Sequence, residues 1–185
     1  MSMSMSGDRE ILRRVWEGRV ATCIKLAEED LSSYGEPDPH YLMLPRISYF
    51  PLVLEKVRKS FQRHVSPEFR DHEVWLEFDG IPLKMQYPIG VLCDVLNTEG
   101  QAPWMLRLHF SSPPASLISL PSRESMESQF LSCLKEADAL KHRGAVMGAL
   151  QSREHKQLWQ GLVNDKFDEL QHYFLACFPT NLMNL

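Results

Sequence analysis

The sequence predicts an α+β protein, and three observations support this fold class. Short segments that alternate hydrophobic and polar residues, typical of β-strands, recur between residues 21 and 110. Residues 111–122 are rich in proline and serine, a composition typical of a linker. After residue 123 the strand pattern stops, and hydrophobic residues recur at helical spacing.

The overall composition restricts the class of protein. The chain has 185 residues, 44% of them hydrophobic and 24% charged, which is ordinary for globular domains. A net charge of -4 gives no general attraction to nucleic acid. No hydrophobic run is long enough to span a bilayer. The four cysteines form no C-x-x-C pair, which suits reduced thiols, so we expect a cytoplasmic protein.

The first half of the chain predicts a helix, two strands and a second helix. Residues 1–7 are polar and are expected to form a disordered tip. Hydrophobic residues at helical spacing predict a helix over 8–20. Residues 21–26 and 40–50 read as strands, and the proline at position 51 then suits the first turn of a helix.

The next segments predict a hairpin, a short helix and a last strand. Residues 73–78 alternate hydrophobic and polar side chains. The Asp-Gly pair at 79–80 is a strong hairpin signal, and residues 81–87 are expected to return as its second strand. A short helix over 89–96 and a strand over 104–110 follow.

This order of elements predicts a ubiquitin-like β-grasp domain, in which a helix crosses one face of a mixed sheet. We therefore expect the β-grasp domain at 21–110 and a linker at 111–122. A helical region follows at 123–174, built of one helix to about residue 143 and a second from about residue 151 to 174. Residues 175–185 form a separate tail.

The first of these two helices carries a lysine on its polar face. With a turn of about 100° per residue from Met126, a group of apolar residues falls within about 120° of arc and predicts the buried stripe. These residues are Phe130, Cys133, Leu134, Ala137 and Leu140. Lys135 lies about 180° from Met126, whereas Lys141 lies at about 60°, where its stem would follow the stripe. Lys135 is therefore expected to be the accessible lysine.

Several segments resemble the autophagy protein 5 family, in the same order along the chain. They are 16–19 (WEGR), 41–49 (YLMLPRISY), 77–84 (EFDGIPLK), 87–90 (YPIG), 103–104 (PW), 109–110 (HF), 132–142 (SCLKEADALKH), 155–159 (HKQLW), 161–162 (GL) and 164–168 (NDKFD). The resemblance covers about residues 8 to 168. A set of collinear segments is more specific than any single motif.

The resemblance implies a function in a conjugation system. It implies that Lys135 is joined by an isopeptide bond to the C-terminal glycine of autophagy protein 12. It also implies that the conjugate, held by the coiled-coil partner autophagy protein 16, promotes transfer of autophagy protein 8 family members to phosphatidylethanolamine. Autophagosome membranes grow as a result. The chain would be cytoplasmic and recruited peripherally to preautophagosomal membranes.

The chemistry expected of this chain is that of a substrate, not of an enzyme. Isopeptide formation needs a neutral amine, and a free lysine amine is protonated at neutral pH. The residues near Lys135 on its helix include Glu124, Glu136 and Asp138, which favour the charged amine. The proton must therefore be removed by a docked conjugating enzyme. We predict no catalytic residue, cofactor or metal site.

The sequence departs from the family after residue 168. The second ubiquitin-like domain of the family is absent, so the sequence is either a shortened form or part of a longer one. The coiled-coil partner docks in the family across both ubiquitin-like domains and the helical region, so this departure removes part of its docking surface. Two alternatives to the acceptor function remain. One is a shortened form that inhibits conjugation, and the other is a non-conjugated module that binds partners through its sheet.

Other residue groups have simpler interpretations. No His or Cys pair has zinc-site spacing, and Cys133 is expected to pack inside the helical region rather than act as the nucleophile of a Cys-His hydrolase. The basic helix face formed by Lys56, Arg58, Lys59 and Arg63 is either solvated or able to contact anionic lipid. Trp75, out of phase with its strand, either packs against the helical region, which we expect, or contacts a partner.

Overall fold

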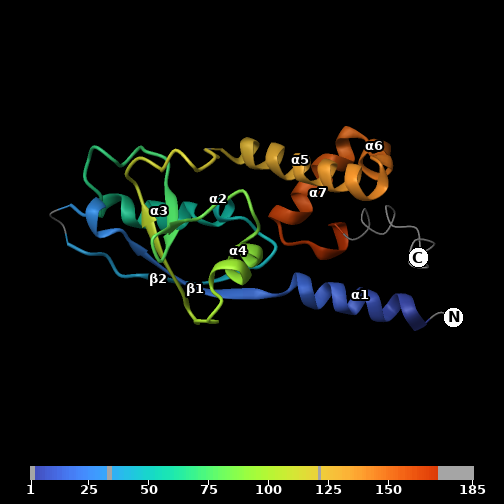
Figure 1. Ribbon diagram of the computed structural model, residues 1–185, viewed down its shortest axis with the longest axis horizontal. Helices are drawn as coiled ribbons and strands as arrows, with labels where there is room; N and C mark the ends of the chain where they lie inside the picture. Colours follow the sequence, from blue (N-terminus) through green and yellow to red (C-terminus); the bar gives the residue numbers. More distant parts are fainter. Residues whose placement is uncertain (1–2, 33–34, 121, 171–185) are drawn as a thin grey trace. The chain divides into compact units, whose positions relative to one another are not determined.

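The structure, a computed structural model, confirms the predicted α+β fold class (Figure 1). It describes residues 3–32, 35–120 and 122–170, with the backbone alone described for residues 3–8. The chain divides into two compact units, Met1–Arg123 and Glu124–Leu185. The first unit holds the N-terminal helix and the sheet, and the second is helical wherever it has regular structure.

The first unit contains a five-stranded mixed sheet with the β-grasp order β2-β1-β5-β3-β4. Its strands are β1 (Arg19–Leu26), β2 (His40–Pro45), β3 (Trp75–Phe78), β4 (Ile81–Pro82) and β5 (Trp104–His109). The central strands β1 and β5 run parallel, and all other neighbours are antiparallel. The parallel pairing requires a crossover between these strands, which the intervening helices and hairpin supply.

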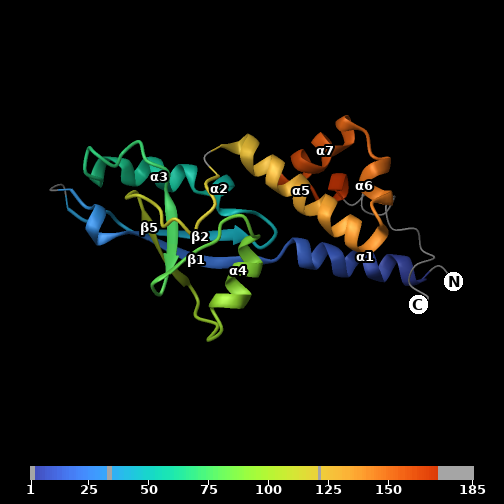
Figure 2. The same cartoon turned by 45° about the horizontal axis from the view of Figure 1, so that its top comes forward.

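The helices of the first unit are α1 (Met3–Trp16), α2 (Phe50–Val53), α3 (Glu55–Phe61) and α4 (Ile89–Leu96), with the short 3-10 helices η1 (Glu28–Asp30) and η2 (Gln62–His64). The helices α2, α3 and α4 contribute buried residues to the core of the sheet, whereas α1 extends away from it (Figure 2). Val57 and Phe61 of α3 are buried in a core that contains the inward residues of β1 and β5. The alternating pattern of β1 and β5 therefore corresponds to a sheet with one face covered by the core and one face open to solvent.

The element boundaries differ from the sequence predictions at several points. The helix α1 begins at Met3, inside the segment expected to be a disordered tip, and ends at Trp16. The strand β2 ends at Pro45, where Ser48 donates its backbone N–H to the Pro45 carbonyl and forms a turn. The strand β4 keeps two residues of the predicted seven. The hairpin itself is confirmed, since Asp79 and Gly80 both have positive φ.

Trp75 has partners within the β-grasp unit. Its ring stacks on His109 of the neighbouring strand, with the ring centroids 3.9 Å apart. Its indole N–H donates to the Ser111 carbonyl at 3.0 Å. These contacts explain the burial of Trp75 out of phase with Leu76, and packing against the helical region stays a prediction.

The predicted linker is fastened to the β-grasp unit along most of its length. We call residues 111–120 the strap. At its start, the buried Asp30 carboxylate accepts the backbone N–H groups of Phe110 and Ser111. Near its end, Leu120 is buried and Leu117 packs against the core. The strap is therefore part of the folded unit and not a free spacer.

Arg46 joins three elements that meet at one end of the sheet. Its backbone N–H donates to the Gly18 carbonyl before β1, and its carbonyl accepts the Gly90 N–H at 2.7 Å, at the start of α4. Its guanidinium pairs with Asp94 of α4 at 2.5 Å. Both glycines leave room for this side chain, because a Cβ at Gly18 would lie 2.8 Å from Arg46 Cδ and one at Gly90 would lie 2.9 Å from Arg46 Cβ.

We expect Gly90→Ala to destabilise the protein by about 1–3 kcal/mol, because the added methyl group overlaps the backbone and Cβ of Arg46. The measurement is the urea dependence of unfolding, followed by tryptophan fluorescence. Val91→Ala is the matched control, since Val91 is the next residue of α4 and is 48% exposed. An equal loss of stability in both variants would contradict the close packing described at Gly90.

Candidate functional site

The candidate site lies on α5 (Arg123–His142), the long helix of the second unit. Its fully buried residues are Met126, Phe130 and Asp138. Met126 is 0% exposed and Phe130 is 7% exposed, so the first half of the predicted stripe is confirmed. Phe130 lies beside Trp159, with the ring centroids 5.7 Å apart, which joins α5 to α7 (Ser152–Val163).

The second half of the predicted stripe is wrong. Leu140 is 90% exposed and Ala137 is also exposed. The position that turns inward is Asp138, which is only 5% exposed. On the helical projection Asp138 lies about 120° from Met126, so the buried face is rotated toward it and away from Leu140.

Hydrogen bonds explain how a carboxylate occupies the buried face. The Asp138 carboxylate accepts the backbone N–H of Met147 at 2.7 Å and that of Val146 at 3.3 Å. These amides belong to the first turn of α6 (Ala145–Ala149), where backbone N–H groups have no partner inside the helix. Asp138 therefore caps α6 from the side, and sequence analysis missed this role because it counted Asp138 as part of the polar face.

The turn after α5 brings these amides into reach. Arg143 and Gly144 both have positive φ, and the Gly144 N–H donates to the Asp138 backbone carbonyl at 3.2 Å. This reversal ends α5 and starts α6 within a few residues. His155 of α7 then contacts the Met147 carbonyl through its Nε2 at 3.3 Å. The three helices are thus joined through polar contacts around Asp138 and Met147.

The helix α7 begins as predicted but ends much earlier. A capping box of Gln151 and Glu154 starts it, with the Gln151 N–H donating to the Glu154 carboxylate at 2.7 Å. It stops at Val163, and the Lys166 N–H donates to the Gly161 carbonyl at 2.9 Å. The predicted helix is therefore interrupted at residues 164–166, and residues 167–170 are helical again. Residues 171–174 of that prediction, and the tail at 175–185, lie outside the described residues.

Lys135 is exposed, as the helical projection predicted. Among residues 3–32, 35–120 and 122–170, none forms a hydrogen bond or ion pair with its side chain. Lys141 is also exposed, so the prediction that its stem follows the apolar stripe is wrong. Leu140, the residue before Lys141, is exposed as well, so the last turn of α5 has no covered apolar stripe at these two positions. Exposure alone therefore does not separate the two lysines.

The acidic residues expected near Lys135 do not contact its amine in the described ranges. Asp138, three residues along α5, points inward, and its oxygens accept the α6 amides. Glu136 is exposed and lies beside Lys135 in sequence only, since adjacent helical residues point about 100° apart.

The described thiols do not form a catalytic group. Burial raises the pKa of the Cys93 thiol above its ordinary value, which keeps it protonated at neutral pH. Cys133 accepts a hydrogen bond from the Gln129 amide at 3.4 Å. Within the described ranges, no group of three or more His, Cys, Asp or Glu residues is arranged to hold a metal ion. In the same ranges, no helix is long and apolar enough to cross a membrane.

The basic residues of the helix after Pro51 are mostly engaged locally. Lys59 pairs with Glu55 at 3.0 Å, and Arg63 donates to His64 at 3.0 Å. Arg58 donates weakly to the His72 carbonyl at 3.4 Å. Lys56 is exposed. The prediction that this face contacts anionic lipid stays a prediction.

Comparison with known proteins identifies two regions of the sequence. Residues 15–110 match the family described as "Autophagy protein ATG5, UblA domain", and residues 123–172 match "Autophagy protein ATG5, alpha-helical bundle region". Autophagy protein 5 of Drosophila melanogaster is 50% identical over 167 residues, which cover 89% of this chain and 62% of the relative. Autophagy-related protein 5 of Caenorhabditis elegans is 39% identical over 166 residues, covering 88% and 60%. The chain thus spans less than two thirds of the length of these relatives.

A solved structure has the same fold. The chain aligns with "Crystal structure of Kluyveromyces marxianus Atg5" with a TM-score of 0.82, covering 94% of this chain and 70% of the other. Sequence identity in that alignment is 18%, so this likeness concerns the fold alone.

We expect Asp138→Ala to destabilise the second unit by about 1.5–3 kcal/mol, because it leaves two buried amides of α6 without a charged acceptor. The measurement is hydrogen exchange at the Met147 amide together with urea unfolding. Glu136→Ala, at an exposed position of the same helix, should change stability by less than about 0.5 kcal/mol. Unchanged exchange at Met147 in Asp138→Ala would refute the capping role.

Proposed function

Since the chain belongs to the autophagy protein 5 family, we propose that it acts in autophagy as the acceptor of a ubiquitin-like modifier, with Lys135 as the attachment site. The observation that carries this proposal is the match of residues 123–172 to the helical region of the family, within which Lys135 stands at the position of the conjugated lysine. Its exposure on a helix of twenty residues is consistent with that role. Asp138 fixes the rotation of that helix one turn further on. The amine is thus presented from a surface whose geometry does not depend on the modifier.

The proposed modifier is autophagy protein 12, activated as a thioester at its C-terminal glycine. The neutral Nζ of Lys135 attacks the thioester carbonyl, an isopeptide bond forms, and the enzyme thiolate leaves. The proton lost from the amine passes to a base on the conjugating enzyme. No catalytic residue of this chain takes part, so the chain is a substrate of the step and not an enzyme. No cofactor is needed on this side of the reaction.

The conjugate would then work as a ligase-like complex in the cytoplasm. It would promote transfer of autophagy protein 8 family members to phosphatidylethanolamine and so support autophagosome formation. Recruitment to preautophagosomal membranes would be peripheral and would depend on the complex. The coiled-coil partner autophagy protein 16 belongs to this proposal.

Lys135→Arg should abolish the adduct, with a loss of more than about 100-fold in conjugate yield, because a guanidinium is not a nucleophile at neutral pH. The reaction is followed in cells by immunoblot and by mass spectrometry of the branched peptide. Lys141→Arg is the control, since Lys141 is also exposed on the same helix and its substitution should leave the yield unchanged. Full conjugation of the Lys135→Arg chain would disprove the attachment site.

A second candidate function is a non-conjugated module that binds a partner through the open face of the sheet. The register places Tyr41, Cys23 and Met105 in one row across β2, β1 and β5. Tyr41 is 69% exposed and Met105 is 39% exposed, and Met43 on the same face is 65% exposed. Tyr41→Ser with Met43→Ser would weaken such binding and leave conjugation at Lys135 intact, which separates the two functions.

A further inference from the structure

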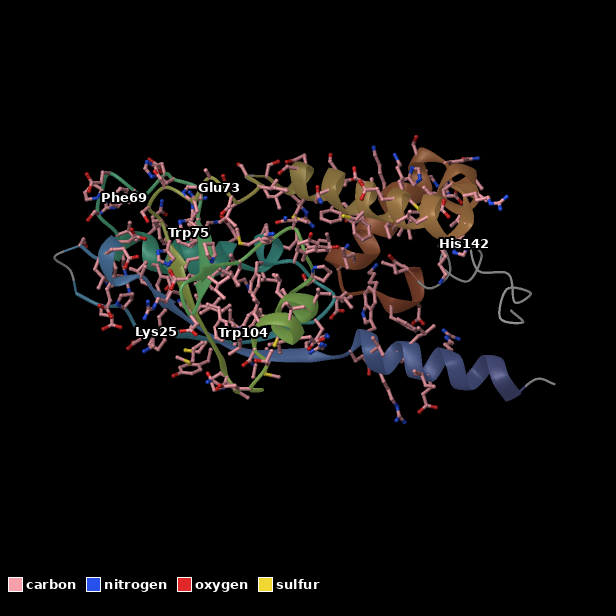
Figure 3. All side chains as sticks on the ribbon, viewed as in Figure 1. Lys25, Phe69, Glu73, Trp75, Trp104 and His142 are labelled. Carbon is pink, nitrogen blue, oxygen red and sulfur yellow. The ribbon has the colours of Figure 1, made fainter. Side chains whose placement is uncertain are left out.

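Both carboxylate oxygens of Glu73 hold the end of the strap. Oε2 accepts the hydroxyl of Ser119 at 2.5 Å, and Oε1 accepts the backbone N–H of Leu120 at 2.8 Å. Glu73 comes just before β3, two residues from Trp75, and both side chains are labelled in Figure 3. A single carboxylate therefore closes the strap through one side-chain donor and one backbone donor.

The two ends of the strap are fastened differently. The first end is held by the Asp30 carboxylate, which is 0% exposed, and by the indole of Trp75. The second end is held by Glu73 together with the burial of Leu120, which is 8% exposed. Ser119 itself is exposed and lies in an irregular segment, so an enzyme can reach its hydroxyl. The second end of the strap is thus accessible, and its attachment to Glu73 includes the Ser119 hydroxyl.

We propose that Ser119 is a phosphorylation site that opens the strap. A protein kinase would transfer the terminal phosphoryl group of a nucleoside triphosphate to Ser119 Oγ. The new P–O bond forms at Oγ, the bond to the nucleoside diphosphate breaks, and the hydroxyl proton leaves to a base on the kinase. This modification site is independent of the proposed acceptor function and stands even if Lys135 is not conjugated.

The chemistry of the contact determines the effect of the modification. Phosphorylation removes the hydroxyl donor and places a charge of about −1.5 to −2 against the Glu73 carboxylate. Repulsion then separates the two groups, and the Leu120 amide loses its charged acceptor. Burial of Leu117 and Leu120 still favours the closed strap, and the proposal requires that the repulsion and the lost hydrogen bonds outweigh it.

Other serines of the strap do not share this geometry. Ser116 is exposed, and no contact joins it to Glu73 in the part of the chain that the structure describes. A phosphate at Ser116 adds the same charge to the same segment without removing a donor from Glu73. Ser116 is therefore the matched control for charge alone.

The test uses the full chain with phosphoserine incorporated at position 119 or 116 during synthesis. Hydrogen exchange is then measured across the strap. We expect the Leu120 amide to exchange about 10–100 times faster with phosphoserine at 119, and to be unchanged with phosphoserine at 116. Equal exchange in the 119-modified and unmodified chains would overturn the proposal.

Reversing the charge at Glu73 distinguishes two causes of strap opening, electrostatic repulsion and simple loss of a hydrogen bond. Glu73→Lys alone should open the strap, because it removes both acceptors. In that variant, phosphoserine at 119 should close the strap again by pairing with the new ammonium group. Faster exchange in the doubly changed chain than in Glu73→Lys alone would refute the electrostatic mechanism.

Occupancy in cells is measured by phosphopeptide mass spectrometry of the protein with phosphatases inhibited. A phosphate mapped to Ser119 supports the proposal. A strap peptide that is recovered in quantity and stays unmodified at Ser119 under growth and starvation overturns it.

Discussion

A buried carboxylate on α5 fixes which side of that helix meets solvent. Asp138 is 5% exposed, and a charged group at that depth is stable only if donors surround it. The first amides of α6 supply those donors, and the reversal at Arg143 and Gly144 brings them into position. Rotation of α5 about its axis would break these bonds. The outward direction of Lys135 follows from this constraint rather than from the apolar residues alone.

The same use of carboxylates recurs in the β-grasp unit. Asp30 accepts the amide that follows β5, at 2.6 Å, and Glu73 accepts the amide of Leu120. In each case an acidic side chain satisfies backbone donors where a regular element or a packed segment ends. In both units, then, carboxylates accept backbone amides at the ends of strands, helices and the strap. Charged hydrogen bonds of this kind also make the strap sensitive to local charge.

Elements with strong local signals were predictable from the sequence. The helix α4 was predicted at its observed residues, 89–96, because a proline precedes it and an apolar helical pattern fills it. The hairpin at Asp79 and Gly80 was equally clear, since both residues tolerate positive φ. The exposed position of Lys135 also followed from the helical projection.

Features that depend on tertiary contacts were not predictable in this way. Asp138 reads as a polar surface residue until the amides of α6 are placed beside it. The phase of Trp75 in its strand does not indicate that its ring stacks on His109 of the adjacent strand. After α7 ends, the chain turns back and the Lys166 N–H donates to the Gly161 carbonyl at 2.9 Å. The spacing of hydrophobic residues in one sequence does not predict which distant residues contact each other.

The most direct test of this account is the rate at which each lysine amine reacts with a small acylating reagent, in the native chain and in denaturant, read by mass spectrometry. The account predicts that Lys135 reacts as fast in the native chain as in the unfolded one. A Lys135 that reacts only after unfolding would contradict it, because the helix would then present another face to solvent.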